Sequence, residues 1–158
     1  MKYILPLCLQ ALFLIGTFAC SKPTTYVPTL TAISGEDEKI LERIIKETSV
    51  WDETFQNVEI SESCLKASYI ETRKPSAFSI NQGITTVPIT KFIYFSNINR
   101  FDLYTGKSGW VVYLYDKSDN ELFDIRFLDE TRAKQFVDII MGMAKREQAK
   151  TAVPKPKA

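Results

Sequence analysis

The fold is decided by residues 100–127, RFDLYTGKSGWVVYLYDKSDNELFDIRF, in which large apolar residues recur at every second position. This period predicts β-strands, because successive side chains of a strand point to opposite faces of a sheet. Two polar segments, residues 105–109 and 117–120, separate the apolar runs and are rich in the residues that form turns. The stretch therefore predicts an antiparallel meander of three strands.

One face of this meander should point into a core and the other outward. The inward set is apolar: Phe101, Leu103, Val112, Leu114, Phe123, Ile125 and Phe127. The outward set combines tyrosine with arginine, a composition typical of interface anchors. We call it the Tyr–Arg face and take it as a possible partner surface, made of Arg100, Tyr104, Tyr113, Tyr115 and Arg126. Ordinary cross-strand packing on a solvated sheet, or cover by an N-terminal helix, is the alternative interpretation.

Helical patterns flank the strand-rich region. Ser34 is a candidate N-cap followed by three acidic residues, which favour the positive end of a helix dipole. An apolar face then follows at helical spacing: Ile40, Leu41, Ile44, Ile45 and Thr48. A second helix should begin after Asp129, with a buried stripe made of Ala133, Phe136, Val137, Ile140 and Ala144. This second helix is expected to close one open end of the sheets, with Phe136 at the centre of its stripe.

Further strands are expected upstream of the meander, at residues 58–60, 65–71, 78–81 and 85–95. Pro75 and Pro88 should lie at strand ends, edges or bulges, because proline cannot donate to a sheet ladder. The predicted fold is therefore α+β. It is an antiparallel β sandwich or barrel of about six or seven strands with an N-terminal helix and a C-terminal capping helix.

Residues 87–103, VPITKFIYFSNINRFDL, together with the following hairpin and closing helix, resemble the pleckstrin-homology-like superfold. The resemblance implies two near-orthogonal sheets with a C-terminal helix that plugs one open end. A helix-grip fold, in which a curved sheet wraps a long C-terminal helix around a cavity, is the alternative. Arg73 and Lys74 are too few bases to imply inositol-lipid recognition, and the fold alone implies no function.

The N-terminus has the anatomy of a targeting segment. Lys2 is the only charged residue among the first nineteen, and residues 4–18 are mostly apolar, too short a stretch to cross a core of roughly 30 Å comfortably. The junction Ala19-Cys20 resembles the bacterial lipoprotein signal, which implies that Cys20 receives diacylglycerol and becomes the mature N-terminus. Ser21 resembles the residue found in lipoproteins sent to the outer membrane. Two alternatives are ordinary cleavage of a signal peptide after residues 17–19, and an uncleaved segment that anchors the chain in the membrane.

These patterns divide the chain into four segments. We expect a signal peptide at residues 1–19, a lipidated tether at 20–33, one domain at 34–148 and a disordered tail at 149–158. The tether and tail are inferred from their proline content and from the lack of any apolar period.

Composition narrows the chemistry. The 158 residues contain no histidine, which removes the commonest general base and metal ligand. The 20 basic and 19 acidic residues lack the basic excess of nucleic-acid binders. Cys64 is expected to be a small buried residue rather than a nucleophile, or a disulfide partner of Cys20 if Cys20 carries no lipid. We therefore expect no enzyme activity, cofactor, metal site or nucleic-acid partner.

The resulting expectation is a membrane-anchored lipoprotein of the bacterial envelope, held through lipid on Cys20, with a non-enzymatic binding or scaffolding domain. An envelope protein is the candidate partner. The alternative is a carrier of small hydrophobic ligands, which needs a cavity on the order of several hundred Å³ lined by the inward Phe and Ile residues.

Overall fold

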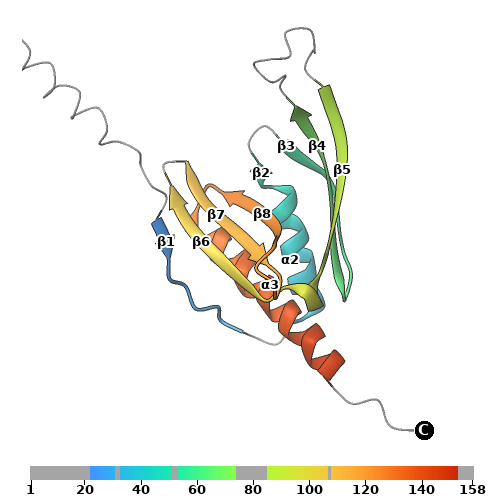
Figure 1. Ribbon diagram of the computed structural model, residues 1–158, viewed down its shortest axis with the longest axis vertical. Coiled ribbons are helices and arrows are strands. Elements are labelled where there is room, and N and C mark those ends of the chain that lie inside the picture. The colour runs from blue at the N-terminus through green and yellow to red at the C-terminus, as the bar shows by residue number, and fades with distance from the viewer. Residues whose placement is uncertain (1–21, 31–32, 51–52, 74–84, 107, 153–158) are drawn as a thin grey trace, which may run out of the picture.

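The computed structural model describes residues 22–30, 33–50, 53–73, 85–106 and 108–152. Within them the chain forms two antiparallel sheets and two helices, an α+β arrangement as predicted (Figure 1). The two sheets remain separate and open and do not close into a barrel.

The first sheet contains the predicted meander. Its strands follow the order β1-β6-β7-β8, with bounds β1 Lys22–Thr24, β6 Arg100–Gly106, β7 Gly109–Tyr115 and β8 Glu121–Phe127. The β7–β8 turn is closed by Asp116, whose Oδ1 accepts hydrogen bonds from the backbone N–H groups of Ser118 (2.7 Å) and Asn120 (2.9 Å). Asp119 in this turn has a positive φ of 60°. The prediction of a turn at residues 117–120 is therefore confirmed.

The second sheet follows the order β2-β3-β4-β5, with bounds β2 Ser49–Val50, β3 Glu53–Ile60, β4 Cys64–Arg73 and β5 Thr85–Tyr94. Two of the four upstream strand predictions fall within β3 and β4, and the third, at residues 85–95, matches β5 except for Phe95, which begins a 3₁₀ turn. The fourth, at residues 78–81, and Pro75 lie outside the described residues. Pro88 lies in β5 at the edge of this sheet, as predicted. The short strands β1 and β2, of three and two residues, were not predicted individually, because such short pieces show no period in the sequence.

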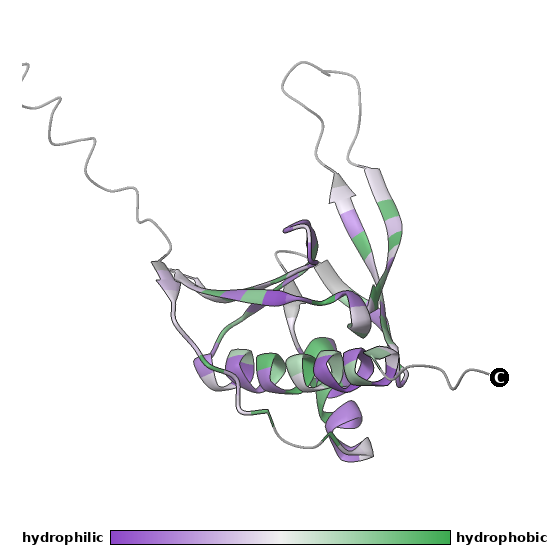
Figure 2. Ribbon diagram, turned by 60° about the horizontal axis from the view of Figure 1, so that its bottom comes forward, coloured by the Kyte–Doolittle hydropathy of each residue, from purple (hydrophilic) through white to green (hydrophobic). Residues whose placement is uncertain are grey.

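Both helices begin where the capping residues predict. The Ser34 side chain accepts a hydrogen bond from the backbone N–H of Asp37, and the Asp37 carboxylate accepts from the Ser34 N–H at 2.8 Å, which closes a capping box before α2, Gly35–Lys46. Asp129 accepts from the N–H of Arg132 at 2.8 Å and so caps α3, Glu130–Ala152. Figure 2 shows α3 as a layer along one face of the β6–β7–β8 sheet.

One hydrophobic core joins the two helices to both sheets. Phe123 of the first sheet contacts Phe55 of the second at 6.1 Å between ring centroids, and Phe127 contacts Phe136 of α3 at 5.3 Å. Phe136 is fully buried, as are the other members of its predicted stripe. The 3₁₀ turn η1, Phe95–Asn97, carries the chain from the second sheet to the first.

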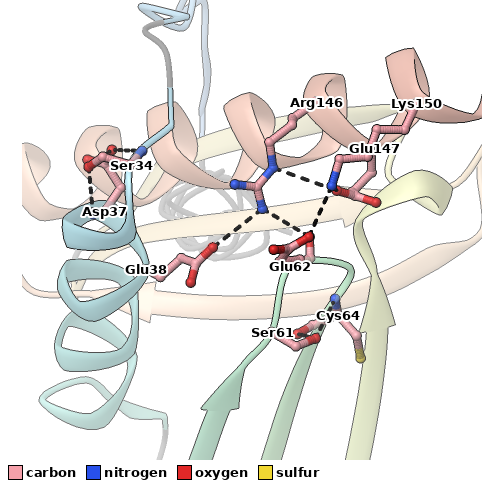
Figure 3. Close-up of polar contacts among 9 residues, drawn as sticks. All are labelled: Ser34, Asp37, Glu38, Ser61, Glu62, Cys64, Arg146, Glu147 and Lys150. Carbon is pink, nitrogen blue, oxygen red and sulfur yellow. Dashed lines mark hydrogen bonds and ion pairs between the residues drawn. The ribbon is translucent and has the colours of Figure 1, made fainter.

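Polar contacts tie the C-terminal half of α3 to the rest of the domain (Figure 3). Arg146 Nη2 lies 3.4 Å from Glu38 Oε1 of α2 and donates to the carbonyl oxygen of Glu62, in the β3–β4 turn, at 3.0 Å. Lys150 Nζ lies 3.2 Å from Glu62 Oε2 and 2.8 Å from Glu147 Oε1. This group of charges fixes α3 against α2 and the second sheet.

Regular secondary structure also occurs on either side of residues 34–148. Lys22–Thr24, within the expected tether, pair with β6, and the Tyr26 hydroxyl donates to Asp138 of α3 at 2.8 Å. This segment pairs with the edge of the meander and makes side-chain contacts with α3. Neither kind of contact requires a hydrophobic period in the segment's own sequence. At the other end α3 continues to Ala152, beyond the expected boundary at residue 148, while residues 153–158 lie outside the described part of the chain.

Candidate functional site: the Tyr–Arg face

The structure brings all five predicted residues of the Tyr–Arg face onto one side of the first sheet. Arg100 lies opposite Tyr115 across the β6–β7 pair, and Tyr104 lies opposite Val111, which in turn lies opposite Arg126 of β8. The predicted inward set points into the core, where Phe101 is half-buried and its other six members are buried. The predicted division into inward and outward sets is therefore confirmed.

A groove of about 310 Å³ runs along this face. Four of the five predicted residues line it, together with residues of the β6–β7 connection: Tyr104, Gly106, Ser108, Gly109, Val111, Tyr113, Tyr115 and Arg126. Arg126 Nη1 donates to Ser108 Oγ at 2.9 Å, so the connection forms one wall of the groove. The sequence prediction missed Ser108 because its segment shows only turn composition. Knowledge of the register between β7 and β8 would have placed Ser108 beside Arg126.

The three tyrosines form a continuous chain of rings. Tyr104 and Tyr113 meet edge to face, with centroids 5.7 Å apart and planes at 86°, and Tyr113 lies 6.4 Å from Tyr115. Burial raises the pKa of Tyr113, with a further contribution from the negative charge of Asp124. Burial likewise raises the pKa of Tyr115, followed by the charge of Asp102. Both phenols are therefore neutral at pH 7 and can donate and accept hydrogen bonds.

The two arginines of the face differ in their surroundings. Arg100 stacks over Tyr115 at 3.9 Å and pairs with Asp102 (2.7 Å) and Asp119 (2.8 Å), and these two carboxylates raise its pKa. It therefore fixes one margin of the face against the β7–β8 turn. Arg126 is half-buried in the groove wall, and this burial lowers its pKa. Among the described residues that line the groove, Arg126 is the cationic one.

The cysteines offer no reaction centre within the described residues. Cys64 is half-buried in β4, its Sγ donates to the carbonyl oxygen of Leu65 at 3.4 Å, and burial raises the pKa of the thiol. A raised pKa keeps the sulfur protonated at neutral pH, which disfavours nucleophilic chemistry. Cys20 lies outside the described part of the chain.

Several large apolar residues that the structure describes are exposed at positions not predicted from the sequence. Phe92 and Tyr94 on the outer side of β5 are 57% and 52% exposed, opposite Lys66 and Cys64 of β4. Leu128, directly after β8, is 87% exposed. Each of these residues is next in sequence to a buried apolar residue, Ile93 or Phe127, so local composition does not reveal that it faces solvent.

Other kinds of site are not found among the residues that the structure describes. No helix there combines the length and apolarity needed to cross a membrane. The same residues contain no cluster of three or more His, Cys, Asp or Glu side chains that could hold a metal ion. No family model, no curated protein and no solved structure matches this chain. The functional interpretation therefore depends on the chemistry of the Tyr–Arg face and on the N-terminal sequence.

Proposed function

We propose that this chain is a lipoprotein of the bacterial envelope, processed before Cys20 and held at the outer membrane by lipid on that residue. Its domain is a non-enzymatic binding module that engages an envelope protein through the Tyr–Arg face. The observation that carries the binding role is the groove in which Tyr104, Tyr113, Tyr115 and Arg126 converge.

The chemistry of the groove supports protein recognition. Tyrosine offers a large ring with few rotatable bonds, and so loses little conformational entropy when it is covered. The ring contacts within the face already hold Tyr104, Tyr113 and Tyr115 in place, which lowers the cost of ordering them in a complex. Arg126 adds a planar group that can bind a carboxylate or a backbone carbonyl of the partner.

The packing of the inward aromatic residues favours a binding module over a carrier. A carrier would need Phe123 and Phe127 to line an internal cavity, yet both rings are almost fully buried and lie against Phe55 and Phe136. Filling that space with a ligand would require these contacts to open, which is costly in a closely packed core. The carrier hypothesis predicts that a fluorescent fatty acid binds the purified domain, and our proposal predicts that it does not.

Site-specific photo-crosslinking in intact cells tests the binding role. A photoreactive phenylalanine analogue replaces Tyr113 in the groove, and a control chain carries it at Thr90 on the outer face of β4 and β5. We expect a discrete crosslinked protein from position 113 and none from position 90. Equal crosslinking from both positions, or none from either, would contradict the proposal.

A further inference from the structure

The start of the described chain lies beside one particular end of the first sheet. Lys22, the first residue of β1, pairs with Thr105 near the end of β6, and the next pair along the hairpin is Gly106 with Gly109 (Figure 1). Cys20 precedes Lys22 by two residues, a span of about 7 Å at most. A lipid on Cys20 would therefore bring this end of the sheet, and no other, to the membrane surface.

The same end carries the most exposed of the large apolar residues that the structure describes. Leu128, 87% exposed, follows Phe127, which pairs with Trp110 at the start of β7. The neighbouring backbones are close, since a Cβ added to Gly109 would lie 3.4 Å from the Cα of Leu128. Trp110, the strand partner of Phe127, is half-buried against the core, and tryptophan is enriched at the level of lipid headgroups. We call Gly106, Ser108, Gly109, Trp110 and Leu128 the hairpin end.

The basic residues that follow Leu128 are paired with carboxylates, so these residues add no net positive charge that would attract anionic lipid. Arg132 lies 3.0 Å from Glu47 and 3.6 Å from Asp129, and Lys134 lies 2.7 Å from Glu130. Without a net positive charge from these residues, Leu128 would insert through the hydrophobic effect, which does not require anionic lipid.

From these observations we propose that the hairpin end docks on the phospholipid bilayer, with Leu128 inserted at the boundary of headgroups and acyl chains. The inference rests on lipid attachment at Cys20, because one leucine and one tryptophan bind a membrane only weakly unless a lipid anchor holds them beside it. In the docked orientation, the β6–β7 end of the first sheet contacts the membrane. Trp110 packs on the core side of the first sheet and the Tyr–Arg face lies on the other side, so the groove points along the membrane surface and stays open to a partner.

Tryptophan placed at position 128 tests this orientation. The mature lipoprotein carries Trp51→Phe and Trp110→Phe together with Leu128→Trp, and is reconstituted in phosphatidylcholine vesicles with or without brominated acyl chains. Phe92→Trp in the same background is the matched control, because Phe92 is an exposed apolar residue of the second sheet, near the C-terminal end of β5. We expect the tryptophan at 128 to lose most of its emission in brominated vesicles and the tryptophan at 92 to be unchanged.

The outcomes separate docking from anchoring. A chain that floats with the vesicles but shows no quenching at position 128 overturns docking and leaves the anchor intact. A blue shift without quenching also overturns it, since another protein or a second copy would then cover Leu128. A chain that lacks lipid and does not float removes the anchor and the docking inference together. Should Leu128→Trp fail to fold, the Trp51→Phe chain reports through Trp110, whose emission must also be quenched.

Discussion

The outer faces of the two sheets obey the same alternation but carry different chemistry. On the first sheet the rings of Tyr104, Tyr113 and Tyr115 contact one another and are half-buried. On the second sheet Phe92 and Tyr94 are more than half exposed, beside polar pairs such as Ser68 and Thr90. A period of two therefore determines which residues face outward, and the identity of neighbours across the strands determines whether they form a groove.

This contrast separates a preorganised surface from a solvated one. The groove on the first sheet is held from behind by α3 and from its margin by Arg100 with Asp102 and Asp119. The outer face of the second sheet has exposed ion pairs such as Lys66 with Glu59, which contribute little to stability. We therefore place the binding role on the first sheet. The following predictions test the difference.

The largest effect is expected from the support behind the first sheet. Phe136→Ala removes a fully buried ring that contacts Phe127 and should cost about 3–5 kcal/mol of unfolding free energy. Lys134→Ala on the same helix should cost less than about 0.5 kcal/mol, because Lys134 makes a surface ion pair with Glu130. Thermal denaturation of both variants decides this. Equal melting temperatures would show that α3 does not close the core through Phe136.

A smaller loss should follow from the backbone of the hairpin end. Gly109 has a φ of +122°, and an added Cβ would lie 2.2 Å from the carbonyl oxygen of Phe127. Gly109→Ala should therefore cost at least about 1–3 kcal/mol through backbone strain. At Gly106 the nearest atom to an added Cβ is 4.0 Å away, so Gly106→Ala is the matched control and should leave stability almost unchanged. If urea denaturation showed that Gly109→Ala leaves the free energy of unfolding unchanged, that result would contradict the described β7–β8 geometry.

Truncation of one tyrosine on each face compares the two surfaces directly. Tyr113→Ala breaks two ring contacts, each contributing about 0.5–1.5 kcal/mol beyond area burial, and should destabilise the domain measurably. Tyr94→Ala removes a ring that is 52% exposed, and its effect should stay within about 0.5 kcal/mol. Chemical denaturation measures both. If Tyr94→Ala proved the more damaging, the Tyr–Arg face would not be the ordered surface of the pair.

The smallest effect concerns two exposed carboxylates. A hydrogen bond from Lys66 lowers the pKa of Glu59 on the second sheet, and hydrogen bonds from Asn120 lower the pKa of Asp116 in the β7–β8 turn. Each contributes stability that is present above its unfolded pKa and is lost as the pH falls through its lower folded pKa. Because salt screens an exposed ion pair, added salt should raise the pKa of Glu59 toward its ordinary value and leave that of Asp116 nearly unchanged. Carbon-detected NMR titration at two salt concentrations measures this, and parallel changes would contradict it.

Periodicity and capping made much of the fold predictable. The meander, the caps at Ser34 and Asp129 and the buried stripe around Phe136 each follow from contacts within a few residues of sequence. The pairing of Lys22–Thr24 with β6 and the contacts of Arg146 join segments far apart in the chain, and local sequence carries no signal for them.

The candidate site was predictable to a similar degree. Alternation placed Tyr104, Tyr113 and Tyr115 on one face, but only strand register shows that Ser108 walls the groove and that Arg100 is already paired. The exposure of Leu128 depends on where β8 ends against its neighbour. That end is set by tertiary packing rather than by residue type.

Lipid attachment at Cys20 underlies both the proposed function and the docking of the hairpin end, and the intact mass of the chain purified from its membrane fraction tests it directly. We predict a mature chain that begins at Cys20 and carries the added mass of diacylglycerol on that residue. A chain with an unmodified Cys20, or one that retains residues 1–19, would contradict the anchoring and with it the orientation of the domain on the membrane.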